Sequence, residues 1–278
     1  MKTFARRLNF GLVIVFLIIT TIFVLYPLVY VISAAVSPGT SIATLSIAPF
    51  ADGFTLEHFR FLFFESDYPI WFRNTFFVAL STSIGTMFIA SISAYTFSRF
   101  RFAFKKGMMM SLLILQIFPS FVGMIAIFVV LLRLGMFNTL QGLVLVYLAM
   151  NIPFNVWLVK GYMDTISRSV DEAARLDGAS HFRTYLTIIL PMARPILIFL
   201  AVTSFTAPWM DYILPQLILR TPENQTLALG LFTFVQDDTR NEFTRFAAGA
   251  VTVAIPFIIA FVATQKLLVT SLGSAVKE

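Results

Sequence analysis

Long apolar runs separated by short polar stretches dominate the pattern of the chain. Six such runs occur, at residues 10–34, 71–97, 108–132, 140–159, 188–212 and 246–269. Because an α-helix rises 1.5 Å per residue, about 20 apolar residues are enough to cross the hydrocarbon core of a bilayer. The pattern therefore predicts an all-α integral membrane protein with six transmembrane helices.

The connections between these runs suggest a simple organisation. We expect a first helix and outer loop over residues 1–70, a core of five transmembrane helices over residues 71–270, and a tail over residues 271–278. Small residues near Ser33 resemble a signal-peptide cleavage site, but the apolar run before them is longer than the roughly 7–15 residues of a signal peptide. We interpret it as an uncleaved first span.

The composition excludes several classes of function. Of the 278 residues, 58% are hydrophobic and 12% charged, against about 45–50% and 25% in ordinary soluble domains. A soluble enzyme is therefore disfavoured. With no cysteine and two isolated histidines, thiolate chemistry and a histidine-rich metal cluster are also disfavoured, and we expect no catalytic residue, metal or cofactor on this chain.

The basic residues predict the orientation. Lys and Arg in short connections mark the cytoplasmic side, and 14 of the 20 fall on one side of the six predicted helices, which places both termini in the cytoplasm. This distribution explains the net charge of +6 better than a nucleic-acid surface does. The cytoplasmic set is Lys2, Arg6, Arg7, Arg99, Arg101, Lys105, Lys106, Lys160, Arg168, Arg175, Arg183, Arg194, Lys266 and Lys277.

The connection at residues 169–191 has a helical pattern of its own. Ser169 is a candidate N-cap, with Glu172 completing a capping box. Gly178 is placed for a left-handed helix end, and Ser180 could cap a second short helix. The pattern predicts a helix-turn-helix knob that a partner could approach closely; taken alone, without the rest of the string, it favours an ordinary connecting loop.

The full string in this connection resembles the EAA loop of type I permease subunits in binding-protein-dependent ATP-binding-cassette (ABC) importers. The match consists of Glu172-Ala173-Ala174, then Gly178, Ile188, Leu190 and Pro191 at that family's spacing. From residue 71 onwards the chain is also similar to the maltose and maltodextrin permeases, at residues 73–75, 94–99, 157–161, 227–232 and 265–278. In the tail, Ser271, Ser274 and Glu278 depart from that pattern.

The resemblance implies a permease that forms half of a transmembrane pathway in the cytoplasmic membrane of a bacterium or archaeon. Its partners would be a second permease, two ATPase subunits that bind ATP and Mg, and an extracytoplasmic sugar-binding protein. This chain has no Gly-Lys dipeptide and hence no P-loop, so the ATPase would be another chain. The implied ATPase-docking residues are Glu172, Ala173, Ala174, Arg175, Asp177, Gly178, Leu190 and Pro191.

The resemblance also implies the cargo, an oligosaccharide. Maltose or maltodextrin is the first expectation, and a galacto-oligosaccharide or a glycerol-phosphate is the alternative. From another class, an ion-coupled carrier stays open, although no charged residue at membrane depth suggests an ion relay. An intramembrane hydrolase or transferase would need a catalytic cluster that the sequence does not show.

Polar residues within the predicted spans are candidates for the pathway. Asn151 and Asn155 are four residues apart and so share a helix face. Gln116 precedes Pro119 and Ser120 in the third span, and Asp211 lies near the outer end of the fifth. Both pathway lining and helix packing are open for these residues.

The outer loop, residues 219–245, is the last candidate site. It contains Pro222, Gln225 and an apolar segment from Leu227 to Phe232. The resemblance implies that this loop reaches the sugar-binding protein. A solvated loop is the alternative.

Overall fold

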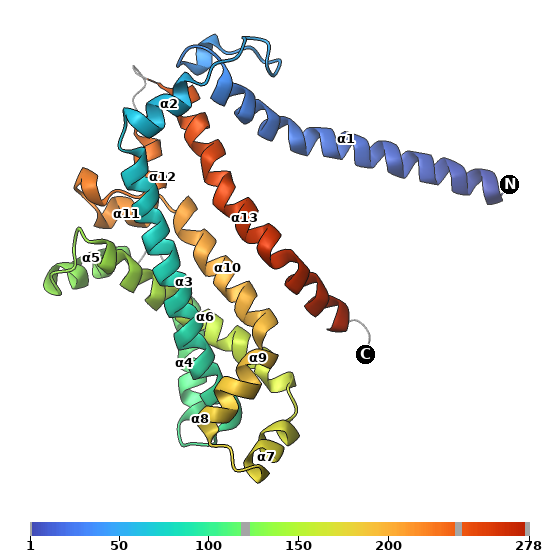
Figure 1. Cartoon of the computed structure of the whole chain (residues 1–278), viewed down its shortest axis with the longest axis vertical. Helices are drawn as coiled ribbons and strands as arrows, with labels where there is room; N and C mark the ends of the chain where they lie inside the picture. Colours follow the sequence, from blue (N-terminus) through green and yellow to red (C-terminus); the bar gives the residue numbers. More distant parts are fainter. Residues whose placement is uncertain (1, 118–122, 237–240, 276–278) are drawn as a thin grey trace. The chain divides into compact units, whose positions relative to one another are not determined.

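The computed structural model describes residues 2–117, 123–236 and 241–275, and within these ranges side chains are described from residue 10 to residue 265. All regular structure in the described residues is helical, which confirms the all-α class. The long helices are α1 (Lys2–Val36), α3 (Tyr68–Arg99), α6 (Leu140–Thr165), α10 (Arg194–Met210) and α13 (Phe243–Ala275). They are shown in Figure 1.

Four helices of the described chain are long and apolar enough to cross a membrane. These segments are Phe10–Val36, Tyr68–Arg99, Leu140–Thr165 and Phe243–Gln265, and they correspond to the first, second, fourth and sixth predicted spans. A fifth candidate is the bent pair His181–Met192 and Arg194–Met210, whose two parts meet at 77°.

The third and fifth predicted spans are not single helices. The third corresponds to α4 (Lys105–Ile117) and α5 (Met124–Arg133), of about 20 and 15 Å at 1.5 Å per residue. Pro119 and Ser120 lie outside the described residues. The fifth was expected to be continuous over residues 188–212 but breaks at Ala193, which is the N-cap of α10. Pro195, in the first turn of α10, lacks an N–H group and so cannot continue the hydrogen-bond ladder of the preceding helix.

Short helices connect these elements. They are η1 (Ile42–Thr44), α2 (Glu57–Phe64), α7 (Arg168–Leu176), α8 (His181–Thr184), the π-helical turn η2 (Tyr185–Ile189), α9 (Leu190–Met192), α11 (Ile213–Ile218), η3 (Pro222–Asn224) and α12 (Leu227–Phe232).

The chain forms two compact units, of which unit 1 comprises Met1–Pro69 and Gly230–Ile255. The segment after α1 folds back on the end of that helix: the Phe50 N–H donates to Ser33 Oγ at 2.6 Å, and the His58 ring contacts the carbonyl of Ser37, the residue after α1, at 2.9 Å. Arg245 lies over the Phe61 ring, 3.5 Å from its centroid. Contacts such as this one place residues 230–255 in the same compact unit as the N-terminal segment.

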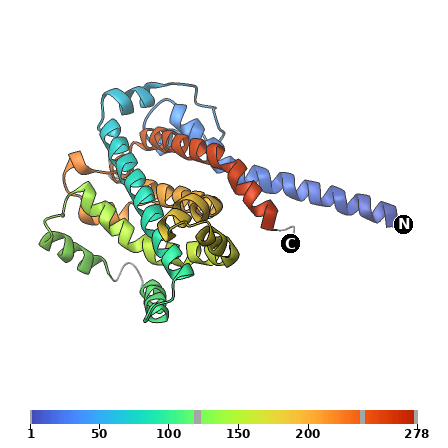
Figure 2. The same cartoon turned by 60° about the horizontal axis from the view of Figure 1, so that its bottom comes forward.

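Unit 2 comprises Ile70–Leu229 and Pro256–Glu278 and contains α3, α6 and α10 side by side (Figures 1 and 2). Small α3 residues permit close packing, since Thr86 and Ala90 are buried and Ser83 donates to the Ala201 carbonyl at 2.8 Å. The described residues of unit 2 include two hydrophobic cores. One includes Tyr95, Val159 and Ile189, and the other includes Val78, Leu143 and Ile218.

Candidate functional site

The helix-turn-helix knob predicted within residues 169–191 is present as α7 and α8, residues 168–184, at one end of unit 2 (Figure 1). Its first cap differs from the prediction: Ser167, not Ser169, is the N-cap of α7 and accepts a hydrogen bond from the Ser169 N–H at 3.3 Å. The helix starts earlier because Ile166 ends α6 in an extended conformation, which frees the chain to turn at once. Glu172 therefore has no place in a capping box.

The turn between α7 and α8 follows the prediction. Gly178 has φ +79°, a left-handed conformation that side chains other than glycine adopt at a cost. The N–H of Ala179 donates to the Ala174 carbonyl at 2.9 Å, as expected for a glycine helix end. Ser180 caps α8 by accepting from the Arg183 N–H at 3.3 Å.

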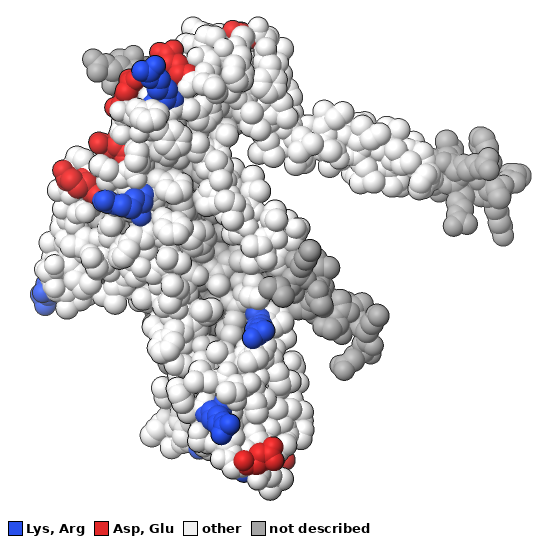
Figure 3. Space-filling model, viewed as in Figure 1, with Lys and Arg blue, Asp and Glu red and all other residues white. Residues whose placement is uncertain are grey.

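Helix α7 has one buried and one exposed face. Asp171 and Ala174 are buried, whereas the opposite face exposes Glu172, Ala173, Arg175, Leu176, Asp177 and Gly178. Leu176 is 90% exposed and Phe182 of α8 is 68% exposed. In Figure 3, charged side chains lie at this end of unit 2 and uncharged ones cover α3 and α10 beside it. The exposed face combines charge with apolar groups, as docking surfaces do.

The buried side of the knob and the π-helical turn η2 after it are attached to α3 by three residues spaced four apart, and hence on one face of that helix. Ser91 Oγ and Tyr185 Oη share a hydrogen bond at 2.8 Å. Tyr95 Oη donates to the His181 carbonyl at 3.2 Å. Arg99 Nε forms an ion pair with Asp171 Oδ2 at 2.8 Å, and these two side chains are only 5% and 7% exposed.

Arg99 also connects the knob to the end of α6. Its guanidinium donates to the carbonyl of Met163 at 3.1 Å and to that of Ile166 at 3.0 Å. With the Asp171 ion pair, one side chain thus holds α3, α6 and α7 together. Sequence reasoning missed this pair, because residues 72 positions apart can be matched only once α3 and α7 are placed side by side.

Leu190 and Pro191 lie away from the exposed face of α7. Both are half-buried in α9, beyond the π-helical turn η2. The structure therefore brings together residues 172–178 of the predicted docking set but places the last two residues in the bent segment that leads into α10.

The predicted pathway residues mostly make local contacts. Asn151 donates to the Tyr147 carbonyl and Asn155 to the Asn151 carbonyl, both at 2.8 Å and both within α6. Asp211 accepts from Tyr147 Oη at 2.9 Å and from the Ile213 N–H at 3.0 Å, so it joins α6 to the start of α11. Gln116 is exposed at the end of α4.

The outer loop is held against α3 by two buried residues at the start of that helix. Asn74 Nδ2 donates to the carbonyls of Glu223 at 2.7 Å and Gln225 at 2.9 Å. Thr75 Oγ1 accepts from the Leu227 N–H at 2.7 Å. Leu227 is fully buried, whereas Pro222, Glu223 and Phe232 are exposed.

Asn138 is a second anchor of the outer loop that sequence reasoning missed. Its side-chain oxygen accepts from the N–H groups of Arg220 at 2.8 Å and Thr221 at 3.2 Å, and its carbonyl accepts from Asn224 Nδ2 at 2.7 Å. Its φ of +57° is a conformation that asparagine tolerates better than most residues. The signal in the sequence that could have identified this anchor is the position of Asn138 directly before Thr139, the N-cap of α6.

Comparisons with known proteins agree with this architecture. Residues 86–274 match the family model described as "Binding-protein-dependent transport system inner membrane component". The chain is 38% identical over 268 residues to the maltodextrin transport system permease protein MdxG of Bacillus subtilis, covering 96% of each chain. It is 39% identical over 254 residues to the galactooligosaccharides transport system permease protein GanQ of the same organism, covering 90% of this chain and 89% of that one.

A solved structure supports the fold independently. A chain of a bacterial ABC transporter involved in the import of the acidic polysaccharide alginate superposes with a TM-score of 0.83. The superposition covers 94% of this chain and 97% of that chain, at 23% sequence identity. At this identity the likeness establishes the type I permease fold.

Proposed function

Because this chain belongs to the family of inner membrane components of binding-protein-dependent transport systems, which are transport subunits, we propose that it is the permease of an ATP-driven oligosaccharide importer. The observation that carries the proposal is the knob. One face of α7 is fixed to α3 through the buried Arg99–Asp171 ion pair, while the other face, with Glu172 and Leu176, is exposed to a partner.

In the proposed mechanism, the exposed face of α7 docks on a cytoplasmic ATPase that binds ATP and Mg. Movement of the ATPase is transmitted through Asp171 to Arg99, and thus to the ends of α3 and α6. ATP-driven closure then shifts the population between inward-facing and outward-facing pathways. The pathway needs a second permease, since this chain supplies only half of it.

Glu172→Lys tests the docking step. We expect the variant to insert into the membrane normally, to lose its ATPase during purification, and to lose ATP-driven uptake in reconstituted vesicles. Glu65→Lys, which reverses an exposed acid in unit 1, is the matched control and should leave both properties unchanged. Full coupled uptake by Glu172→Lys, or uptake driven by an ion gradient without ATP, would refute the proposal.

We assign the opposite surface to an extracytoplasmic sugar-binding protein. Pro222 and Glu223 are exposed on a short turn whose backbone is fixed by Asn74 and Asn138. Buried Leu227 would not reach such a partner, so the proposed contact narrows to the η3 turn. Glu223→Lys should weaken stimulation by the loaded binding protein while ATPase binding survives.

We propose maltodextrins as the cargo, with galacto-oligosaccharides second, because the similar MdxG and GanQ proteins are named for these sugars. The direct measurement is binding of a panel of oligosaccharides to the cognate binding protein, followed by uptake of the sugars that bind. We further propose that both termini are cytoplasmic, which follows from the distribution of Lys and Arg.

A further inference from the structure

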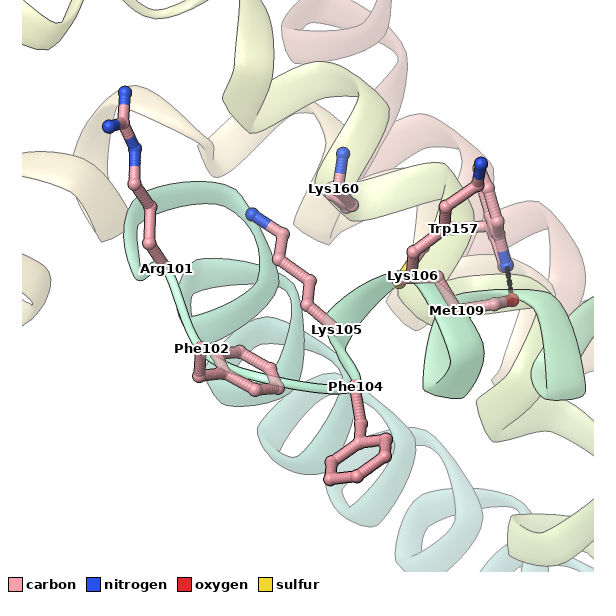
Figure 4. Close-up of a pocket in the computed structure, with 8 residues that line it drawn as sticks. All are labelled: Arg101, Phe102, Phe104, Lys105, Lys106, Met109, Trp157 and Lys160. Carbon is pink, nitrogen blue, oxygen red and sulfur yellow. Dashed lines mark hydrogen bonds between the residues drawn. The ribbon is translucent and has the colours of Figure 1, made fainter.

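A pocket with four cationic side chains lies between the start of α4 and the end of α6. Its volume is about 540 Å³. Figure 4 shows Arg101, Lys105 and Lys160 extending their charged ends to the same side, whereas the Phe104 ring points the opposite way. The lining residues are Arg101, Phe102, Phe104, Lys105, Lys106, Met109, Trp157 and Lys160.

Positive charge in this pocket is only partly compensated. None of the eight lining residues is acidic, and the neighbouring Asp164 is bound to Lys160 Nζ at 2.5 Å. Burial lowers the pKa of Lys105, and the charges of Lys160, Arg168 and Arg101 lower it further against the opposing effect of Asp164. A bound anion would relieve this repulsion, because an opposite charge nearby favours the protonated amine.

The same pocket has an apolar part that a small anion would not need. Trp157 Nε1 donates to the Met109 carbonyl at 3.0 Å, which fixes the indole against α4. Phe104 is 84% exposed and has φ +65°, a conformation that costs a bulky residue about 1 kcal/mol or more. Amphipathic rings such as that of Trp157 are enriched at the boundary between lipid and water.

We propose that this pocket binds the headgroup of an anionic phospholipid, with Arg101, Lys105 and Lys160 around the phosphate and the rings of Phe104 and Trp157 against the acyl chains. The proposal rests on the membrane orientation proposed above, in which residues 99–106 and Lys160 lie at the cytoplasmic boundary. Basic pockets between helices at that boundary suit anionic headgroups. The site is distinct from the exposed face of α7.

The test uses the full-length chain, extracted in mild detergent with any subunits that accompany it. Native mass spectrometry measures its binding of phosphatidylglycerol and, separately, of phosphatidylcholine. We expect preference for phosphatidylglycerol and a loss of affinity of about 30-fold in Lys105→Gln/Lys160→Gln, from the contribution of two lysines near an anionic surface. Arg73→Gln/Arg220→Gln removes the same charge from two exposed outer positions and should bind as the unmodified chain does.

Two further arms separate the alternatives. Lys105→Arg/Lys160→Arg, which keeps the charge, should retain the lipid. Inorganic phosphate at 100-fold excess should not displace it, and displacement would identify a site for a free anion instead. Equal phosphatidylglycerol binding by both glutamine double variants would also overturn the proposal. Because ATPase retention is recorded on the same samples, failure of the lipid site and failure of the proposed importer function are distinguishable.

Discussion

The two ends of unit 2 both hold a connecting segment against α3, but with different chemistry. The knob is held by the buried Arg99–Asp171 ion pair, supported by Tyr95. In unit 2, the described residues 219–229 of the outer loop are held by neutral groups, chiefly Asn74 and Asn138. Removing one partner of a buried ion pair leaves the other charge buried and unpaired, which costs several kcal/mol of stability. Removing one neutral hydrogen-bonding group costs less. The knob therefore depends on a single contact far more than the outer loop does.

The exposed faces differ in the same way. At the knob, the residues that α3 does not use remain available, and Glu172 and Leu176 are exposed. In residues 219–229 of the outer loop, Leu227 and Leu229 are buried, and the exposed residues are Arg220 together with Pro222 and Glu223 of the η3 turn. One segment is rigidly attached on one side and open on the other, which suits transmission of force. The other segment, the outer loop, is largely buried against its own unit.

Loss of the Arg99–Asp171 ion pair should have the largest effect on the free energy of unfolding. Asp171→Ala leaves Arg99 charged and buried, and we expect the free energy of unfolding to fall by about 3–5 kcal/mol. Asp177→Ala, on the exposed part of the same segment, should change it by less than about 0.5 kcal/mol. Denaturant titration of the full chain in micelles measures both. Equal effects of the two variants would show that the ion pair is not the knob's main attachment.

Asn74, which anchors the outer loop, should contribute less to the free energy of unfolding than the ion pair does. Asn74→Ala removes the donor to two loop carbonyls, and we expect a loss of roughly 1–3 kcal/mol together with faster amide exchange in residues 220–227. Exchange in the knob should stay unchanged, which is the internal control. If Asn74→Ala destabilised the chain as strongly as Asp171→Ala, the proposed difference between the two ends would be wrong.

The sequence predicted more of the helices than of their connections. Hydrophobic length identified α1, α3, α6 and α13, and local signals placed Gly178 and Ser180 correctly. The break at Ala193 was missed because hydropathy does not register backbone geometry, although Pro195 carried the information. Arg99 with Asp171, and Asn138 with the outer loop, were missed because each contact joins segments distant in sequence. The predicted pathway and docking roles still await experiment.

The turn of the knob offers a smaller perturbation. Gly178→Ala forces a side chain into left-handed backbone, although its new methyl group would meet no atom within 4 Å. We expect a cost of about 1–2 kcal/mol from the backbone alone, and a smaller cost in Gly178→Asn because asparagine tolerates this conformation. Thermal unfolding ranks the two variants. If asparagine were no better tolerated than alanine, side-chain crowding rather than φ would be the cause.

The exposed face of the knob should show almost no effect on stability. Leu176 is 90% exposed, so Leu176→Ser should change the free energy of unfolding by less than about 0.5 kcal/mol. Its effect should fall instead on retention of the ATPase during purification, because an apolar group at a docking surface is buried only in the complex. Leu134→Ser removes another exposed leucine, 57% accessible at the end of α5, and should change neither property. If Leu176→Ser behaved like Leu134→Ser in both measurements, this leucine would be an ordinary solvated residue, and docking would have to rest on the charged residues of α7 alone.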